Sequence, residues 1–204
     1  MKTGLGLYRK YRMLYAYLNL LRFSIRKYLI GFDVANLFIQ RVDKRSLKMI
    51  LKKNGATIGE NCDIETGLIF HNCKNYTNLM IGNNCHIGKA CFFDLRGKIT
   101  IHNNVVISMK TTIITHQDLN KSDLSILYPA VHGDVEIASN CYIGTNATIL
   151  KDVSVSNNSI IAAGAIVSEN ISAYSIVGGV PAKLINLNHL IFCSSGIFVP
   201  SVPP

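Results

Sequence analysis

The stretch VEIASNCYIGTNATILKDVSVSNNSIIAAGAIV (135–167) repeats a pattern every six residues. A strand with one buried face has a period of two residues and a helix a period of 3.6, so neither explains a strict period of six. Such a period is typical of a solenoid of short strands, in which one aliphatic residue of each unit points into a three-sided prism. The aliphatic positions here are Ile137, Ile143, Ile149, Val155, Ile161 and Val167.

The same period is found earlier in the chain, with two interruptions. Three units make a coil of about 18 residues, and coils stack at the strand spacing of roughly 4.8 Å. We therefore predict an all-β solenoid, a parallel β-helix of about five coils, over residues 55–185. Residues 71–79 form a short insertion and residues 117–134 a longer excursion loop. The earlier anchor positions are Ile58, Ile64, Phe70, Ile81, Ile87, Phe93, Ile101, Ile107 and Ile113.

Two further positions of the repeat suit tight coils. Two residues before the anchor a small residue recurs, and Cys62, Cys85, Cys91 and Cys141 fall in this position. We interpret these four cysteines as small buried side chains. Three residues after the anchor Asn or Asp recurs, and both tolerate the left-handed backbone of a corner. No C-x-x-C pair occurs, so we predict no metal site and reduced thiols in a cytosolic chain.

The net charge of +9 is concentrated near the N-terminus. Residues 1–54 carry 13 Lys and Arg against two acids, whereas residues 55–204 carry 8 against 10. No helix-turn-helix, RRM or zinc-finger pattern is present, so we do not expect a nucleic-acid partner. We divide the chain into a basic N-terminal helical segment (1–54), the β-helix (55–185) and a C-terminal tail (186–204).

Residues 7–30 are predicted to form a helix that interleaves basic residues, tyrosines and leucines. This composition suits a membrane headgroup region, so one interpretation is a cytoplasmic protein with a peripheral contact at the inner membrane surface. The alternative is a helix that caps the open end of the prism or packs between subunits. A second helix is expected over residues 34–53.

His116 is the histidine to which the repeat gives a distinctive position. It stands three residues after Ile113, at a corner where Asn or Gly usually occurs, and at the root of the excursion loop. A corner side chain points away from the prism, and an imidazole held there can take a proton from a hydroxyl. We therefore select His116 as a candidate general base; the alternative is a solvent-exposed corner histidine.

Three stretches carry a resemblance to a known family: IGNNCHIG (81–88), TTIITHQD (111–118) and VGGVPAKLI (177–185). With the repeats, they resemble the hexapeptide-repeat, left-handed β-helix acyltransferases, in particular the maltose/galactoside O-acetyltransferases and exopolysaccharide-modifying acetyltransferases. The resemblance implies a left-handed solenoid and a homotrimer with active sites between subunits. It also implies acetyl-CoA as co-substrate without a required metal, and His116 as the base that deprotonates the acceptor.

The resemblance also implies residues on the acceptor side of the site. Asp94 and His86 match positions that contact the carbohydrate acceptor in the galactoside branch. Asp94 would either contact the acceptor or orient the imidazole of His116. Asp118 and Asp123 in the excursion loop are the other carboxylates that we consider as support for that imidazole.

Five positions match the CoA groove of the family. One is a lysine near the nucleotide phosphates, and the others lie along the pantetheine arm. Two departures, Glu169 and Asn186, stand where the family has cations, which predicts weaker CoA binding or a contribution of basic residues from a neighbouring subunit. The five positions are Tyr142, Thr145, Ala163, Ser168 and Lys183.

Together these features predict an acetyl-CoA-dependent O-acetyltransferase that acts on a sugar hydroxyl in surface-polysaccharide biosynthesis. The alternative among enzymes is transfer to the amine of an amino sugar or an antibiotic. The alternative of another class is a non-catalytic β-helix scaffold. A zinc carbonic anhydrase on this fold needs two histidines five residues apart, and Lys121 stands five residues after His116, which excludes that enzyme.

Overall fold

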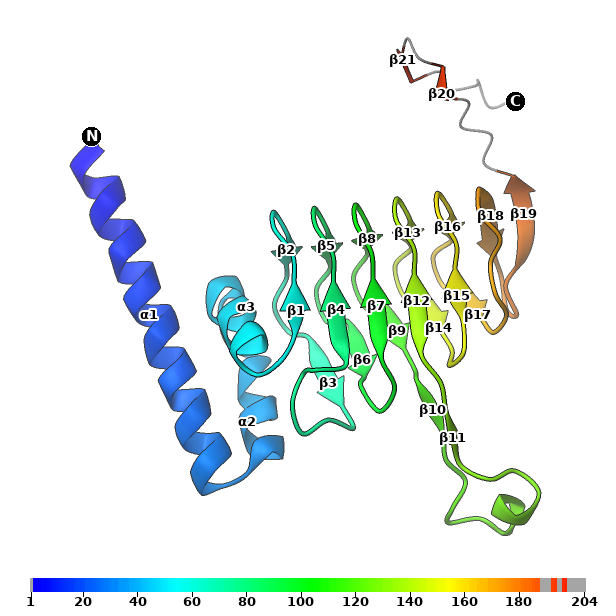
Figure 1. Cartoon of the computed structure of the whole chain (residues 1–204), viewed down its shortest axis with the longest axis horizontal. Coiled ribbons are helices and arrows are strands. Elements are labelled where there is room, and N and C mark those ends of the chain that lie inside the picture. Colours follow the sequence, from blue (N-terminus) through cyan, green and yellow to red (C-terminus); the bar gives the residue numbers. More distant parts are fainter. Residues whose placement is uncertain (1, 188–191, 194–195, 198–204) are drawn as a thin grey trace.

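The computed structural model describes residues 2–187, 192–193 and 196–197, with side chains for residues 8–186. Three helices precede a left-handed parallel β-helix of about six turns, one more than the sequence predicts (Figure 1). The fold class predicted from the six-residue period is therefore confirmed. Most of the predicted tail, residues 186–204, lies outside the described residues; β20 (Phe192–Cys193) and β21 (Gly196–Ile197) pair antiparallel within it.

The prism has three sides, each a sheet whose neighbouring strands come from successive coils. Sheet 1 contains β1 (Thr57–Ile58), β4 (Leu79–Ile81), β7 (Ile99–Ile101), β12 (Val135–Ile137) and β15 (Ser154–Val155). Sheet 2 contains β2 (Asp63–Ile64), β5 (His86–Ile87), β8 (Val106–Ile107), β13 (Tyr142–Ile143), β16 (Ile160–Ile161), β18 (Ser175–Gly178) and the antiparallel β19 (Lys183–Leu187). Sheet 3 contains β3 (Ile69–His71), β6 (Phe92–Asp94), β9 (Thr112–Ile113), β14 (Thr148–Ile149) and β17 (Ile166–Val167).

The anchors of the repeat fill the interior of the prism, as predicted. All of them, from Ile58 to Val167, have side chains that are at most 5% exposed. Burying one such side chain stabilises a fold by about 1.5–3 kcal/mol. The anchors also stack in register, because Ile143 pairs with Ile107 of the preceding coil and with Ile161 of the next.

The predicted corner positions have left-handed backbone. Their φ angles lie between 53° and 63°, at Asn61, Asn84, Asn104, Asn140, Asn146, Asp152 and Asn158. At one edge the asparagines also bond from coil to coil, with Nδ2 of Asn61 donating to Oδ1 of Asn84 at 3.0 Å. The same contact continues from Asn84 to Asn104 at 3.2 Å and from Asn104 to Asn140 at 3.1 Å.

Three of the four cysteines in the repeat are buried, as predicted, and Cys62 is the exception. Cys85, Cys91 and Cys141 are buried and Cys62 is half-buried, and their thiols are free. Burial raises the pKa of the Cys91 thiol to about 11, which keeps the thiol protonated. Among the described side chains, no group of three or more His, Cys, Asp or Glu is arranged to hold a metal ion.

The N-terminal segment forms three helices, α1 (Lys2–Leu29), α2 (Phe32–Ile39) and α3 (Lys44–Lys53). The single helix expected over residues 34–53 is therefore wrong, and Asp43 explains the interruption. Its carboxylate accepts from the backbone N–H groups of Arg45 at 3.1 Å and Ser46 at 3.3 Å, which caps the start of α3.

Helix α3 covers the first coil of the prism, and α1 packs on α2 and α3 from outside (Figure 1). The contact of α1 uses Ala16, Asn19 and Phe23, all nearly inaccessible to solvent. Nδ2 of Asn19 donates to Oγ of Ser46 in α3 at 3.0 Å. Within the described part of the chain, every helix is too short or too polar to cross a membrane.

The excursion loop leaves the prism as a two-stranded ribbon, visible as the long projection in Figure 1. Strand β10 (His116–Gln117) pairs antiparallel with β11 (Val131–His132), and a short helix η1 (Asp123–Ile126) lies between them. His116 is the first residue of this ribbon, so its backbone is fixed both by the coil that ends at β9 (Thr112–Ile113) and by the pairing of β10 with β11.

Candidate active site

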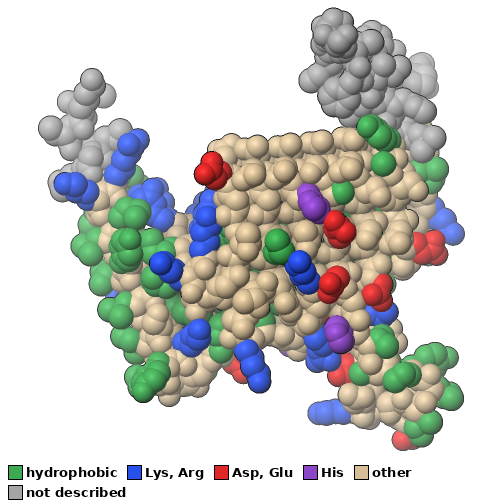
Figure 2. Space-filling model, in the orientation of Figure 1, with side chains coloured by type: hydrophobic (Ala, Val, Ile, Leu, Met, Phe, Trp, Pro, Cys, Tyr) green, Lys and Arg blue, Asp and Glu red, His purple; other side chains and the backbone are tan. Residues whose placement is uncertain are grey.

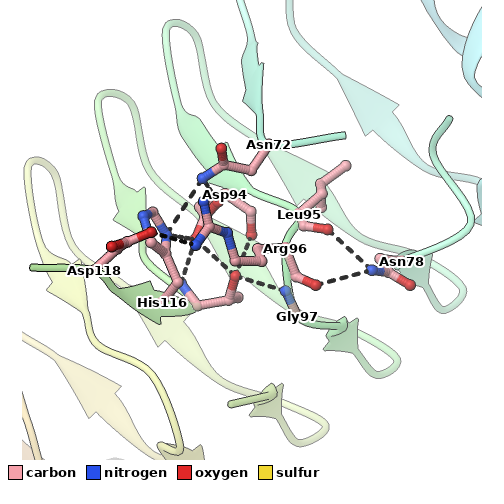
Figure 3. A network of polar contacts seen from close by, with 9 residues as sticks. Asn72, Asn78, Asp94, Leu95, Arg96, Gly97, His116 and Asp118 are labelled. Atoms are coloured by element: carbon pink, nitrogen blue, oxygen red, sulfur yellow. Dashed lines mark hydrogen bonds and ion pairs between the residues drawn. The ribbon is translucent and has the colours of Figure 1, made fainter. Parts of the chain in front are cut away.

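The imidazole of His116 is held at the edge where sheet 3 turns into sheet 1. Its Nδ1 lies 2.6 Å from Oδ2 of Asp94, and the two side chains are 21% and 0% exposed (Figure 3). Because a carboxylate accepts hydrogen bonds, this contact favours the tautomer with the proton on Nδ1. Nε2 then carries a lone pair and can accept a proton from a substrate, which is the arrangement of a histidine general base.

Asp94 is buried and its carboxylate is satisfied by several donors. Oδ2 accepts from the backbone N–H of Thr115 at 2.9 Å and from its hydroxyl at 2.7 Å, and Nδ2 of Asn72 donates to Oδ1 at 2.8 Å. Burial alone would raise the pKa of Asp94, but the hydrogen bonds from His116, Thr115 and Asn72 outweigh it and lower the pKa to about 2. Asp94 therefore remains a carboxylate at neutral pH and keeps the ring of His116 oriented.

Asn72, Asp94 and His116 occupy the same edge of three successive coils. Each is separated from the next by 22 residues, and Nδ2 of Asn72 also lies 3.4 Å from Nδ1 of His116. Asn72 is not among the predicted site residues, because it lies in the insertion at residues 71–79, where the six-residue register is lost. The equal spacing of 22 residues is the signal that could have identified it.

The two carboxylates considered in the excursion loop do not support the imidazole. Asp118 pairs with Nη1 of Arg96 at 3.1 Å, beside the ring (Figure 3). Asp123 is the first residue of η1, away from the prism edge. Of the alternatives weighed for Asp94, its full burial and its bond to His116 favour orienting the imidazole over contacting an acceptor.

A cavity of about 890 Å³ lies between α2 and this edge of the prism. Asn72 and Arg96 line it, and both belong to the network around His116. His71, whose ring centre is 6.5 Å from that of His116, also lines it, although its position in the repeat does not mark it out. Asn36 of α2 and Gln40, which directly follows α2, line the opposite wall, and apolar side chains such as Phe32 and Leu37 lie between the polar ones.

The other predicted site residues lie elsewhere on the chain. Tyr142, which is 43% exposed, projects from β13 of sheet 2, and Thr145 follows at the turn from sheet 2 to sheet 3. Ala163 occupies the same turn one coil later, where the N–H of Gly164 donates to the carbonyl of Thr145 at 2.9 Å. Lys183 is exposed on β19 at the end of sheet 2.

Ser168 and His86 lie at different places on the prism relative to the imidazole of His116. Ser168 directly follows β17, so it lies at the same prism edge as His116, two coils further on. His86 is on β5 of sheet 2, where its Nδ1 lies 3.2 Å from Oδ2 of Asp63. Within one chain, His86, Tyr142 and Thr145 are therefore on another part of the prism than His116.

Comparison with known proteins places the repeat in a family. Residues 135–169 match the model of the hexapeptide repeat of succinyl-transferase. The galactoside O-acetyltransferase of Escherichia coli strain K12 is 29% identical over 155 residues, which cover 71% of this chain and 68% of the relative. By this repeat and this relative, the chain is similar to the hexapeptide-repeat acyltransferases.

Further relatives of this acyltransferase differ in the acceptor after which they are named. An Escherichia coli dTDP-4-amino-4,6-dideoxy-D-glucose acyltransferase is 28% identical over 165 residues, which cover 67% of this chain and 84% of the relative. A hexapeptide-repeat acetyltransferase from Vibrio cholerae O1 biovar eltor, solved with acetyl-CoA, shares the fold. Its TM-score is 0.65 at 18% identity, covering 86% of this acyltransferase and 88% of that chain.

Proposed function

We propose that this acyltransferase transfers an acetyl group from acetyl-CoA to a hydroxyl group of a sugar, with His116 as the general base. The observation that carries the proposal is the 2.6 Å contact between Nδ1 of His116 and the buried carboxylate of Asp94, beside a cavity that polar and apolar side chains line together. A sugar presents several hydroxyl groups, and Gln40, Lys74 and Arg96 in the lining of this cavity carry side chains that form hydrogen bonds with hydroxyls.

The proposed reaction is a direct transfer. Nε2 of His116 takes the proton of the acceptor hydroxyl while that oxygen attacks the carbonyl carbon of the thioester. The tetrahedral oxyanion collapses, the carbon–sulfur bond breaks, and the CoA thiolate receives the proton from the imidazolium. Asp94 is a positioning residue in this scheme, because it holds the ring and stabilises the imidazolium without touching the reacting atoms.

We further propose a homotrimer in which acetyl-CoA lies between two subunits. Tyr142 lies on β13, beside the turn from sheet 2 to sheet 3 that contains Thr145, and Ala163 occupies the same turn one coil later. Within one chain, this turn is at another edge of the prism than His116. A neighbouring subunit that brings this turn to the His116 edge would complete a groove for the pantetheine arm. In this arrangement Lys183 lies toward the CoA phosphates, Ser168 lies along the arm, and His86 reaches the acceptor from the neighbouring subunit.

The proposed acceptor belongs to surface-polysaccharide assembly in the cytoplasm. Transfer to an amino sugar is the second candidate, and the dTDP-amino-sugar acyltransferase among the relatives favours it. Both reactions need a base at the position of His116, so the acceptor must be identified directly.

A screen of acceptors with acetyl-CoA tests the proposal. Release of the CoA thiol would be followed with a thiol reagent across free sugars, nucleotide sugars and their amino counterparts. Turnover with hydroxyl sugars supports the proposal, and turnover with only amino sugars replaces it by the second candidate. If the unmodified chain releases the CoA thiol no faster than the His116→Ala variant does, both with every acceptor and with water alone, the chain is a scaffold and the proposal is wrong.

A further inference from the structure

Helix α1 has a second apolar face, which no other part of the chain that the structure describes covers. Its buried face consists of Ala16, Asn19 and Phe23, which pack on α2 and α3. On the opposite side lies a row of exposed aliphatic residues that we call the α1 stripe. Figure 2 shows hydrophobic side chains along this outer margin of the helix. The α1 stripe consists of Leu14, Leu18, Leu21, Ile25 and Leu29, which are 59%, 44%, 56%, 48% and 71% exposed.

The spacing of the α1 stripe is that of one helix face. Steps of four, three, four and four residues keep these side chains on one side of a helix with 3.6 residues per turn. Single exposed leucines are common on protein surfaces, but a continuous row over four helical turns marks a surface that binds a partner or a membrane.

Tyrosines and cations surround the stripe. Tyr8 and Tyr11 near one end are 57% and 67% exposed, and Tyr28 near the other is 88% exposed. The helix contains no Asp or Glu, and its seven cations are Lys2, Arg9, Lys10, Arg12, Arg22, Arg26 and Lys27. Exposed tyrosines at both ends of an apolar face, with only positive charge beside it, suit the boundary between phosphate headgroups and acyl chains.

We propose that α1 lies flat on the surface of a bilayer that contains anionic phospholipid. The α1 stripe enters the upper part of the acyl region, while Lys10 and Arg22, which flank the stripe on the helix, reach the lipid phosphates. A second copy of this chain is the other apolar occupant to consider. Two copies of α1 packed through their stripes would bring the flanking Lys10 and Arg22 of each copy together with no carboxylate of α1 between them, so charge complementarity favours the anionic lipid surface.

Sedimentation of the full chain with vesicles tests the docking surface. We expect binding to phosphatidylcholine vesicles that contain phosphatidylglycerol, much weaker binding to vesicles of phosphatidylcholine alone, and weakening by high salt. These comparisons need no variant. Failure to bind the anionic vesicles at low salt would overturn the proposal.

Two sets of variants locate the contact. Gln favours helix nearly as well as Leu, so Leu14→Gln, Leu18→Gln and Leu21→Gln combined should leave α1 helical and reduce vesicle binding by more than tenfold. The matched control replaces three exposed apolar residues of the excursion loop: Leu124→Gln, Ile126→Gln and Leu127→Gln, whose side chains are 49%, 85% and 73% exposed. The control should bind as the unmodified chain does, and an equal loss in both triple variants would contradict the assignment to α1.

The charges are tested in the same way. Lys10→Gln with Arg22→Gln should weaken binding to anionic vesicles by about fivefold for each cation removed. Lys89→Gln with Lys110→Gln, two exposed lysines on the prism, should change it little. If light scattering instead shows that the α1 stripe variant forms a smaller assembly while the unmodified chain ignores vesicles, a second copy covers the stripe and the proposal is wrong.

Discussion

His116 and Asp94 lie one coil apart at the same edge of the prism, with Nδ1 of the imidazole 2.6 Å from Oδ2 of the carboxylate. The exposed pair His102 and Glu136 has the same separation, 2.6 Å from Nε2 to Oε1, but there both side chains are about half exposed. Only the buried carboxylate of Asp94 also receives hydrogen bonds from Thr115 and Asn72. The distance alone therefore does not distinguish the two pairs. The pair at the candidate site is held by further hydrogen bonds, whereas the pair at sheet 1 is exposed to solvent.

His116→Ala should lower turnover by roughly 10²–10⁴-fold, because it removes the group that takes the proton of the acceptor. The fold should persist, since the ring lies outside the prism. Thiol release from acetyl-CoA with the best acceptor measures the effect. His102→Ala removes a histidine from the surface of the same prism and should be fully active. Equal activity of the two variants would remove His116 from the mechanism.

Asp94→Asn should lower kcat by roughly 10²–10⁴-fold with little change in KM, because the amide can donate to Nδ1 and stabilise the wrong tautomer of His116. Initial rates at several acceptor concentrations separate the two constants. Glu136→Gln makes the corresponding change in the exposed pair and should alter neither. A rise in KM at constant kcat for the Asp94 variant would instead indicate that Asp94 binds the acceptor.

Asp94 should also make stability depend on acid. Its pKa is about 2 in the folded chain against an ordinary value of 3.8, so the carboxylate stabilises the fold above about pH 4. As the pH falls from about 4 to 2, the unfolded state takes up the proton first, and about 2 kcal/mol of this contribution is lost. Urea unfolding across this pH range should show a smaller loss for Asp94→Asn than for the unmodified chain. Parallel curves for the two proteins would show that the carboxylate has no lowered pKa.

Ile143→Ala should destabilise the prism by about 2–5 kcal/mol, since it opens a cavity in the middle of the stacked anchors. The side chain is inaccessible to solvent and pairs along sheet 2 with coils on both sides. Ile126→Ala makes the same change in the excursion loop, where the side chain is 85% exposed, and should cost little. Urea midpoints of the two variants give the comparison, and a similar midpoint for both would contradict an anchor role for Ile143.

The prism could be predicted from the sequence because each six-residue unit carries its own structural information. One anchor, one small residue and one corner residue recur in every unit, so Ile143 and Asn140 could be placed without knowledge of any distant contact. The helices were predicted less well. A hydrophobic pattern runs across residues 34–53, and the break depends on a single capping carboxylate, that of Asp43.

The candidate site was only partly predictable for a related reason. His116 and Asp94 follow regular anchors, and their roles could be inferred from the coil geometry and the family resemblance. Asn72 comes two residues after Phe70, where the insertion interrupts the six-residue register. Its partner Asp94 is 22 residues further along the chain, in the next coil. The proposed cofactor positions Tyr142 and Thr145 fall on another side of the prism than His116. In the proposed trimer their relation to the imidazole would depend on a neighbouring chain, which no pattern within one sequence describes.

The two ends of the solenoid are closed by different means. At one end α3 packs against β1 and β2, with Leu47, Ile50 and Leu51 fully buried. At the other, β19 runs antiparallel to β18 and its register shifts between Ile176 and Val177. A bare parallel coil would offer each further molecule a matching template, as a growing fibril does. With a helix at one end and a reversed strand at the other, the described part of sheet 2 ends in no bare parallel coil, which disfavours the in-register stacking of one molecule on the end of another.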